Sequence, residues 1–179
     1  YSPQWSFAAY EEVFRTRPMA RYVLNSVIVS AGATVLSVVL AAFAAYGFTR
    51  FHIRGANVFL IFLLFTKMLP ETLLIVPYFQ AMSSLGLVNT YLALILAYSS
   101  FALPFSVWML IGFFRSIPRE IDEAAIVDGA TRLQSFWRVI LPLARPGLAA
   151  VALFTFIIAW NSYVWALVLT TSPDMFVLS

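Results

Sequence analysis

Long apolar stretches alternate with shorter polar segments along this chain, and four of the stretches are long enough to cross a membrane. They cover residues 22–48, 58–79, 91–114 and 147–170. Crossing ~30 Å of hydrocarbon takes about 20 apolar residues in an α-helix. None of the four shows the strict alternation of a barrel strand, and a helix satisfies its own backbone polar groups within lipid. The pattern therefore predicts an all-α polytopic membrane protein, with four spans in a single domain over residues 1–179.

Arginines gather in two of the polar segments, and they set the predicted orientation. The loop between the first two spans holds Arg50 and Arg54, and residues 115–145, between the third and fourth spans, hold the larger group. That group consists of Arg115, Arg119, Arg132, Arg138 and Arg145. Because cytoplasmic loops carry an excess of Lys and Arg, both segments are predicted to lie in the cytoplasm. The uncharged loop 80–90 and the N-terminal segment are predicted to lie on the opposite side, although the latter holds Arg15, Arg17 and Arg21 against Glu11 and Glu12.

Prolines and small residues within the spans predict local features of the helices. Pro70 and Pro77 in the second span and Pro104 in the third predict kinks or broken turns. The first span carries a run of small residues, which predicts close approach to a neighbouring helix. These are Ala41, Ala42, Ala44, Ala45 and Gly47.

Residues 115–145 are far longer than most connections between neighbouring helices, and their residue order predicts two short helices. Pro118 suits a first turn, and the acidic residues that follow it, Glu120, Asp122 and Glu123, complement the positive end of a helix. Gly129 tolerates the left-handed backbone that ends many helices. Thr131 with Gln134 matches a capping box, which starts a second helix that Pro142 is predicted to end.

The first of these short helices carries a compact Ala124-Ala125 face flanked by acids. A knob of this kind can enter a groove on a partner protein. Two alternatives are a helix lying on the lipid surface and a loop folded onto its own bundle. Helices that lie on lipid favour basic residues on their polar face, whereas this one is acidic, which argues against the lipid alternative.

Composition narrows the function classes further. The chain is 62% hydrophobic and only 11% charged, against about a quarter charged in a soluble domain, so lipid is the main solvent. It has no cysteine, and its net charge of +3 is too small and scattered to indicate nucleic acid. The single lysine, Lys67, follows Thr66, so no Gly-x-x-x-x-Gly-Lys phosphate loop is present. The one histidine, His52, is predicted to be solvated, and no catalytic or metal site is predicted. Energy for any transport must then come from another subunit or from a gradient.

Two groups of residues are candidates for a solute pathway. Lys67 and Glu71 are ionisable residues near the middle of the second span, where they form either a structural pair at a broken turn or part of a pathway. In the fourth span, at ~100° per residue, Trp160 and Tyr163 would share one helix face and Asn161 and Trp165 another. Aromatic rings and an amide suit sugars, although Trp and Tyr also serve as interface anchors.

The segment around the first short helix resembles the EAA loop of ABC importer permeases. The family pattern is Glu-Ala-Ala, three residues, Gly, nine residues, Ile, one residue and Leu-Pro. Here it is matched by Glu123-Ala124-Ala125, Gly129 and Leu141-Pro142, with Val139 in place of Ile. Four further stretches resemble the carbohydrate-uptake branch, so that the likeness covers nearly the whole chain. They are Asn25-Ser26, Ala45-Tyr46-Gly47-Phe48 with Arg50-Phe51, Ser84-Leu85-Gly86-Leu87 with Asn89-Thr90, and Trp160-Asn161-Ser162-Tyr163-Val164-Trp165, where that branch more often has an acid at 162 and Pro at 166.

The resemblance implies the transmembrane fold of a type I ABC importer in a bacterial inner membrane. It implies that the loop, with Asp128 beside Gly129, docks into a cytoplasmic ATPase dimer that binds ATP and Mg²⁺, so that this chain is not itself catalytic. A second, related permease subunit would complete a heterodimer, and an extracytoplasmic binding protein would deliver a sugar or sugar-derived solute. The candidate pathway residues are Trp160, Asn161, Tyr163 and Glu71.

The same comparison with six-span family members implies that this chain lacks the first span and most or all of the last. The chain begins at Tyr1 and stops at Ser179 without a terminating signal, so we expect one or both ends to be truncated. The alternatives are an ABC permease for another solute and a gradient-driven carrier. A carrier would need coupling-ion groups within its spans, and only Lys67 and Glu71 are available.

Overall fold

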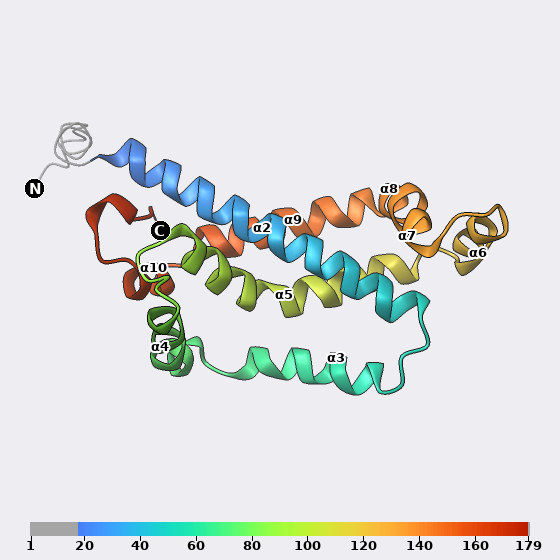
Figure 1. Cartoon of the computed structure of the whole chain (residues 1–179), viewed down its shortest axis with the longest axis horizontal. Helices are drawn as coiled ribbons and strands as arrows, with labels where there is room; N and C mark the ends of the chain where they lie inside the picture. The colour runs from blue at the N-terminus through green and yellow to red at the C-terminus, as the bar shows by residue number, and fades with distance from the viewer. Residues whose placement is uncertain (1–17, 179) are drawn as a thin grey trace, which may run out of the picture.

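Three long helices form the centre of the molecule in a computed structural model, which describes residues 18–178. They are α2 (Met19–Arg50), α5 (Tyr91–Arg115) and α9 (Arg145–Trp160), and each packs against the other two. The N-terminal segment 1–17, which contains Glu11, Glu12, Arg15 and Arg17, lies outside the described residues. Figure 1 shows α2 crossing α9, with α5 running beside them.

Shorter helices complete the chain at the two ends of this bundle. Along the second predicted span lie α3 (Ala56–Phe65), η1 (Thr66–Met68), η2 (Glu71–Leu74) and α4 (Ile75–Ser84). After α5 come α6 (Arg119–Val127), α7 (Arg132–Ser135), the π-helical η3 (Phe136–Ile140) and α8 (Leu141–Leu143). After α9 come α10 (Val164–Leu169) and η4 (Pro173–Met175). No strand occurs within residues 18–178.

Two apolar cores hold the bundle together, one toward each end. The first lies between the last turns of α2, the last turns of α5 and the η3 segment, around Phe114, Phe136 and Ile140. The second lies between the first half of α2, the start of α5 and α10, around Leu94 and Trp165. Of the small residues of α2, Ala41, Ala42 and Ala45 are at most 4% exposed in the first core, and Ala44 and Gly47 are half-buried.

α5 and α9 approach closely at Gly147, where an added Cβ would collide with the side chain of Phe113. Further along the same contact, the buried Ser106 and Thr155 hydroxyls lie 3.1 Å apart and hydrogen-bond across the two helices. Small residues and hydroxyl pairs of this kind are what hold helices together in lipid, where apolar burial gives no driving force.

Of the four apolar stretches, α2 and α5 are single helices long enough to span a membrane, and the other two are bent pairs of helices. Residues 56–68 and 71–84 meet at 93°, because Leu69 and Pro70 have extended backbone angles. The break predicted at Pro70 is therefore confirmed. Pro77 causes none, since it lies in the first turn of α4, where a missing N–H breaks no helical bond. α5 continues as one helix through Pro104, so no broken turn occurs there.

The fourth stretch also differs from a simple span. Residues 132–143 and 145–160 meet at 77°, and α9 ends at Trp160, so residues 161–163 separate it from α10. Pro142 does not end the second loop helix as predicted. It lies in the first turn of α8, where proline is tolerated, and the turn comes two residues later at Ala144.

Candidate functional site

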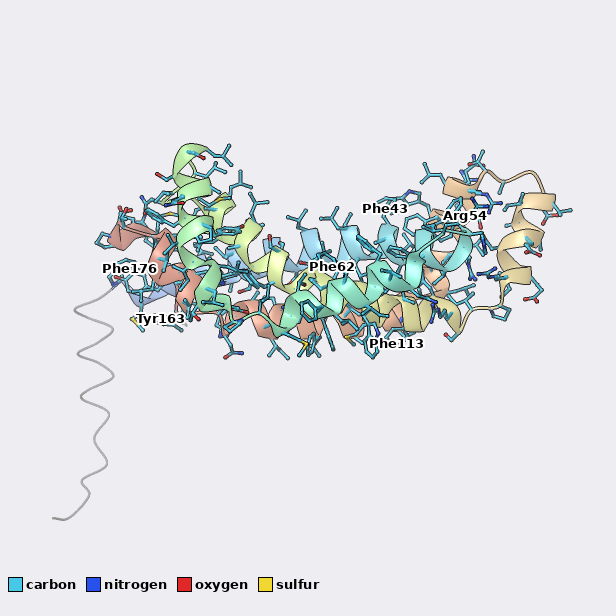
Figure 2. The ribbon with its side chains drawn as sticks, turned by 90° about the horizontal axis from the view of Figure 1, so that it is seen from below. Phe43, Arg54, Phe62, Phe113, Tyr163 and Phe176 are labelled. Atoms are coloured by element: carbon cyan, nitrogen blue, oxygen red, sulfur yellow. The ribbon has the colours of Figure 1, made fainter. Side chains whose placement is uncertain are left out.

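The arginine-rich segments meet at one end of the bundle, and α6 stands beyond it. The end of α2, the start of α3, and helices α6, α7 and α8 all lie at this end, whereas α4 and α10 lie at the other (Figure 1). Figure 2 shows the same separation, with Arg54 far from Tyr163 and Phe176. Spans that alternate in direction place both basic loops on one side, as the arginine pattern predicts.

α6 has the beginning and end that its residues predict. Pro118 precedes its first residue, and Glu120 and Asp122 lie in its first turn, where carboxylates face the positive end of the helix dipole. Gly129 has φ +88° and its N–H donates to the Ile126 carbonyl, while Ala130 N–H donates to the Ala125 carbonyl. This is the left-handed C-terminal motif that glycine favours.

The capping box that starts the second loop helix is also present. The Gln134 N–H donates to Thr131 Oγ1 at 3.3 Å, and the Thr131 N–H donates to Gln134 Oε1 at 2.8 Å. Both bonds use backbone N–H groups that the first turn of a helix leaves without partners. α6 and α7 are therefore fixed at the turn between them by local chemistry.

The proposed docking residues occupy the outer face of α6. Glu123, Ala124, Asp128 and Gly129 are exposed, Ala125 is half-buried, and Val127 is 86% exposed. Leu141 and Pro142, at the end of the matched pattern, are half-buried beneath the loop. The structure thus brings Glu123, Ala124 and Ala125 together on the solvent-facing side of α6. Leu141 and Pro142 lie between the loop and the bundle and are partly covered.

Asp122 of α6, which the sequence predicts only to face the helix dipole, is buried. Asp122 is 3% exposed, and its carboxylate faces Tyr46, Arg50 and Ser135. Tyr46 and Arg50 are four residues apart at the end of an apolar span, so they share a face of α2. Two such polar residues opposite an acidic loop helix are the signal that could have located this cluster.

The candidate pathway residues of the fourth stretch do not lie on one helix. Trp160 is half-buried and stacks on Phe156 with centroids 5.7 Å apart, and Asn161 is exposed with its amide donating to the Ile157 carbonyl. Tyr163 is 53% exposed. The predicted shared faces are wrong because α9 ends at Trp160, and the Tyr98 hydroxyl binds the Ser162 carbonyl at 2.6 Å within the interruption.

Tyr163 lies at the end opposite the arginines, beside a hollow of about 410 Å³. Met19, Tyr22, Leu167 and Phe176 also line it. Figure 2 shows Tyr163 and Phe176 at this end of the molecule. Trp165, by contrast, is 1% exposed and belongs to the core, where it packs against Phe101 and Tyr78 with ring centroids 4.9 and 5.0 Å apart.

Lys67 and Glu71 lie on opposite sides of the break at Leu69–Pro70, and both are exposed. The two form no ion pair with each other, and the Lys67 ammonium lies 5.6 Å from the centroid of the Phe101 ring. Phe101 in turn stacks on Trp165. Lys67 therefore lies beside the Phe101–Trp165 ring pair of α5 and α10, while Glu71 is exposed and forms no ion pair within residues 18–178.

Two asparagines of the carbohydrate-branch pattern, Asn25 and Asn89, hold the segment that follows α10. Asn25 Nδ2 donates to the carbonyls of Asp174 and Phe176 at 2.9 and 2.8 Å, and its Oδ1 accepts from the Tyr91 hydroxyl at 2.8 Å. Asn89, at φ +63°, accepts from the N–H groups of Thr171 and Ser172 through Oδ1. These residues fix the chain at the end opposite the arginine-rich loops.

Comparison with known proteins gives one family match and a set of similar chains. Residues 37–179 match the family model described as "Binding-protein-dependent transport system inner membrane component". The diacetylchitobiose uptake system permease protein NgcG of Streptomyces coelicolor is 41% identical over 98% of this chain. The trehalose transport system permease protein SugB of Mycobacterium tuberculosis is 40% identical over 93%, and the trehalose/maltose transport system permease protein MalG of Thermococcus litoralis is 39% identical over 84%.

The chain spans 58% of the length of NgcG, 61% of SugB and 54% of MalG. A solved structure with a similar fold is that of a bacterial ABC transporter involved in the import of the acidic polysaccharide alginate. The two share 30% sequence identity at a TM-score of 0.80, over 95% of this chain and 59% of the other.

Proposed function

Because this chain belongs to the family of binding-protein-dependent transport system inner membrane components, we propose that it is the membrane-spanning permease subunit of an ATP-driven sugar importer. The observation that carries the proposal is the position of α6. This helix stands beyond the arginine-rich end of the bundle and exposes Glu123, Ala124 and Val127 together. A short, capped helix with a small-residue face outside the membrane is shaped to enter a groove on a cytoplasmic partner.

The partner at α6 is a cytoplasmic ATPase dimer, which binds the ATP and Mg²⁺. The chain has no phosphate-binding Gly-x-x-x-x-Gly-Lys sequence, so it contributes no nucleotide site of that kind. Its part is mechanical: Glu123, Ala124, Ala125, Asp128 and Gly129 form the docking surface, and Leu141 and Pro142 support it from the bundle. The ATPase closes on nucleotide, and α6 carries that displacement to the spans.

The solute is a sugar or a sugar-derived molecule. Three relatives are 39–41% identical to most of this chain, and their names refer to diacetylchitobiose, trehalose and maltose. In this chain, Trp160, Asn161 and Tyr163 offer aromatic faces and an amide near the end opposite the arginine-rich loops, and Glu71 offers an exposed carboxylate. An extracytoplasmic binding protein delivers the solute at that end, and a second, related permease subunit forms the other half of the pathway as a heterodimer.

The experiment that tests this function uses the complete complex reconstituted in liposomes. ATP hydrolysis is measured with binding protein loaded with trehalose or with diacetylchitobiose, for the unchanged chain and for Ala124→Arg. We expect stimulated hydrolysis with one of the loaded binding proteins. We expect the Ala124→Arg chain to insert in the membrane but no longer to bind the ATPase subunits, because a long charged side chain covers the helix face that must enter their groove.

Asn57→Arg is the matched control, since it adds the same charge at an exposed position near the same end of the bundle. It should leave ATPase retention unchanged. Uptake that continues without ATPase and follows an imposed ion gradient would overturn the proposal in favour of a gradient-driven carrier.

A further inference from the structure

Asp122 is a buried carboxylate on a helix whose neighbouring acidic residues are exposed. Its exposure is 3%, whereas Glu120 and Glu123 on either side are exposed to solvent. Removing an ionised carboxylate from water costs several kcal/mol unless charge and hydrogen bonds compensate. The groups around Asp122 must therefore hold it specifically, and they show which elements it connects.

Three elements meet at this carboxylate. From α2, the Tyr46 hydroxyl lies 3.3 and 3.4 Å from the two Asp122 oxygens and 3.1 Å from the Arg132 carbonyl, and Arg50 Nε lies 3.8 Å from Oδ2. From α7, the buried Ser135 hydroxyl donates to Oδ1. α6 itself supplies Asp122, so one side chain joins the end of α2, the docking helix and the start of the second loop helix.

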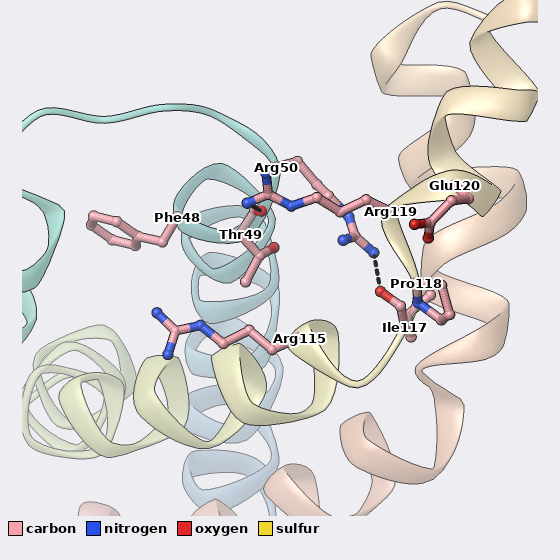
Figure 3. Close-up of a pocket in the computed structure, with 8 residues that line it drawn as sticks. All are labelled: Phe48, Thr49, Arg50, Arg115, Ile117, Pro118, Arg119 and Glu120. Carbon is pink, nitrogen blue, oxygen red and sulfur yellow. Dashed lines mark hydrogen bonds between the residues drawn. The ribbon is translucent and has the colours of Figure 1, made fainter.

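Two arginines strengthen the same connection by crossing between α2 and α6. Arg50, from the last residue of α2, donates to the Ile117 carbonyl at 3.0 Å. Arg119, from the first residue of α6, donates to the Thr49 carbonyl at 2.7 Å. Figure 3 shows the two side chains passing each other, with the Arg50 bond to Ile117 drawn. Arg119 also satisfies a carbonyl that the end of α2 leaves open.

The covalent route from α6 to the bundle is less direct. Residues 116–118, which link α5 to α6, are not helical, and the turn at 128–131 separates α6 from α7. A non-helical linker allows rotation and transmits displacement poorly unless other contacts fix it. Arg50 binds the Ile117 carbonyl within that linker, so the α2 side chain also restrains the hinge between α5 and α6.

We propose that the α2–α6 joint, formed by Tyr46, Thr49, Arg50, Ile117, Arg119, Asp122 and Ser135, makes α2 the span that moves rigidly with the docking helix. This inference rests on the proposed function and adds the route of its motion. Since α2 packs against both α5 and α9, a displacement delivered to α2 reaches the whole bundle. Asp122 is the positioning residue of the joint: it holds α6 through Arg50 and Tyr46 and lies on the side away from the exposed docking face.

The test compares Asp122→Asn with Glu120→Gln in the complete complex. Glu120→Gln is the matched control, because it removes an exposed carboxylate from the same helix. Asp122→Asn keeps an oxygen that can accept from Tyr46 but removes the charge that pairs with Arg50. We expect both variants to retain the ATPase. In Asp122→Asn alone, we expect stimulation of hydrolysis by loaded binding protein to fall about tenfold, because the hydrogen bonds from Ser135 and Tyr46 then lose the charge of their acceptor, an effect on the scale of one charge-assisted hydrogen bond.

A distance measurement separates coupling from general damage. The chain has no cysteine, so spin labels can be placed on His52→Cys and Glu120→Cys, at exposed positions beside the end of α2 and on α6. With the joint intact, the interspin distance should stay narrow and unchanged between nucleotide-free and ATP-vanadate-trapped complexes. With Asp122→Asn it should broaden and shift on trapping, because α6 then moves without α2.

A narrow, unchanged distance together with normal stimulation in Asp122→Asn would overturn the inference. If that variant loses the ATPase, Tyr46→Phe carries the test, since it removes one hydroxyl and keeps the ring that packs on Phe136. A distance that shifts on trapping in Tyr46→Phe supports the joint, and an unshifted one overturns it. Failure of the unchanged complex to retain the ATPase would instead contradict the proposed function.

Discussion

Gly129 and Gly112 differ in backbone conformation but not in the space around them. An added Cβ would meet no atom within 4 Å at either position, while only Gly129 has a positive φ, at +88°. Gly112 lies within α5, in ordinary helical conformation. If alanine substitution changes local stability differently at the two positions, the difference therefore comes from backbone conformation and not from steric contacts.

We predict opposite effects of Gly129→Ala and Gly112→Ala. The first forces a residue with a Cβ into the left-handed region, at a cost of about 1–2 kcal/mol. The second removes a glycine from a helix interior and stabilises it by roughly 0.5–1 kcal/mol. Amide hydrogen exchange across α6 should become about 5- to 30-fold faster in Gly129→Ala and remain unchanged in Gly112→Ala. Equal exchange in both variants would contradict the role given to the left-handed turn.

At the scale of elements, the close contact between α5 and α9 depends on a glycine, which has no side chain. Gly147 lies where Phe113 fills the space that a Cβ would need, and both helices belong to the central bundle. Overpacking a close contact usually costs about 1–3 kcal/mol, because neighbouring side chains must leave their preferred rotamers.

Gly147→Ala should therefore lower the thermal stability of the purified chain in detergent. Phe113→Ala in the same molecule should restore part of it, because the collision is then removed. The expected signature is a double variant more stable than Gly147→Ala alone, measured by thermal unfolding. Independent, additive losses from the two substitutions would show that the two residues do not share this contact.

The second predicted span shows how an element responds to local chemistry. Its apolar content is sufficient for a span, and α3 buries none of its residues within the described part of the chain. Leu69 and Pro70 nevertheless turn the chain through 93°, so that α4 packs against α10 and its Tyr78 reaches Trp165. Hydropathy identifies a stretch that suits lipid, while proline decides where the helix within it must break.

At the scale of the whole molecule, the chain places its candidate functions at opposite ends. α6 and the joint lie at the arginine-rich end, and Tyr163 and the segment held by Asn25 and Asn89 lie at the other (Figures 1 and 2). The core between them is continuous helix in α2 and α5. Effects on solute selection and on ATPase coupling should therefore be separable by mutation.

Tyr163→Ala should raise the solute concentration needed for half-maximal uptake about 2- to 10-fold, which corresponds to losing one aromatic stacking contact. ATPase retention should not change. Leu153→Ala is the control, because Leu153 is 64% exposed in the middle of α9, in the same apolar stretch. Uptake assays with trehalose and diacetylchitobiose would check this, and an unchanged half-maximal concentration would remove Tyr163 from the pathway.

The sequence by itself determined those features of this protein that depend on neighbouring residues. The Gly129 turn, the Thr131–Gln134 capping box and the break at Pro70 each depend on residues within a few positions, and all three occur. The long apolar stretches predict a helical membrane protein for the same reason, since each helix satisfies its own backbone in lipid. The order of Glu123, Gly129 and Leu141 led to the family that the comparisons confirm.

Only the tertiary structure decided which polar residues meet and where a long stretch bends. Asp122 lies 76 positions from Tyr46, and no local pattern distinguishes it from the exposed Glu123 beside it. The helical periodicity of residues 160–165 fails because the chain leaves the helix at Asn161, where Tyr98 from α5 binds the Ser162 carbonyl. Periodicity describes one helix at a time, whereas burial and partner choice depend on the packing of several.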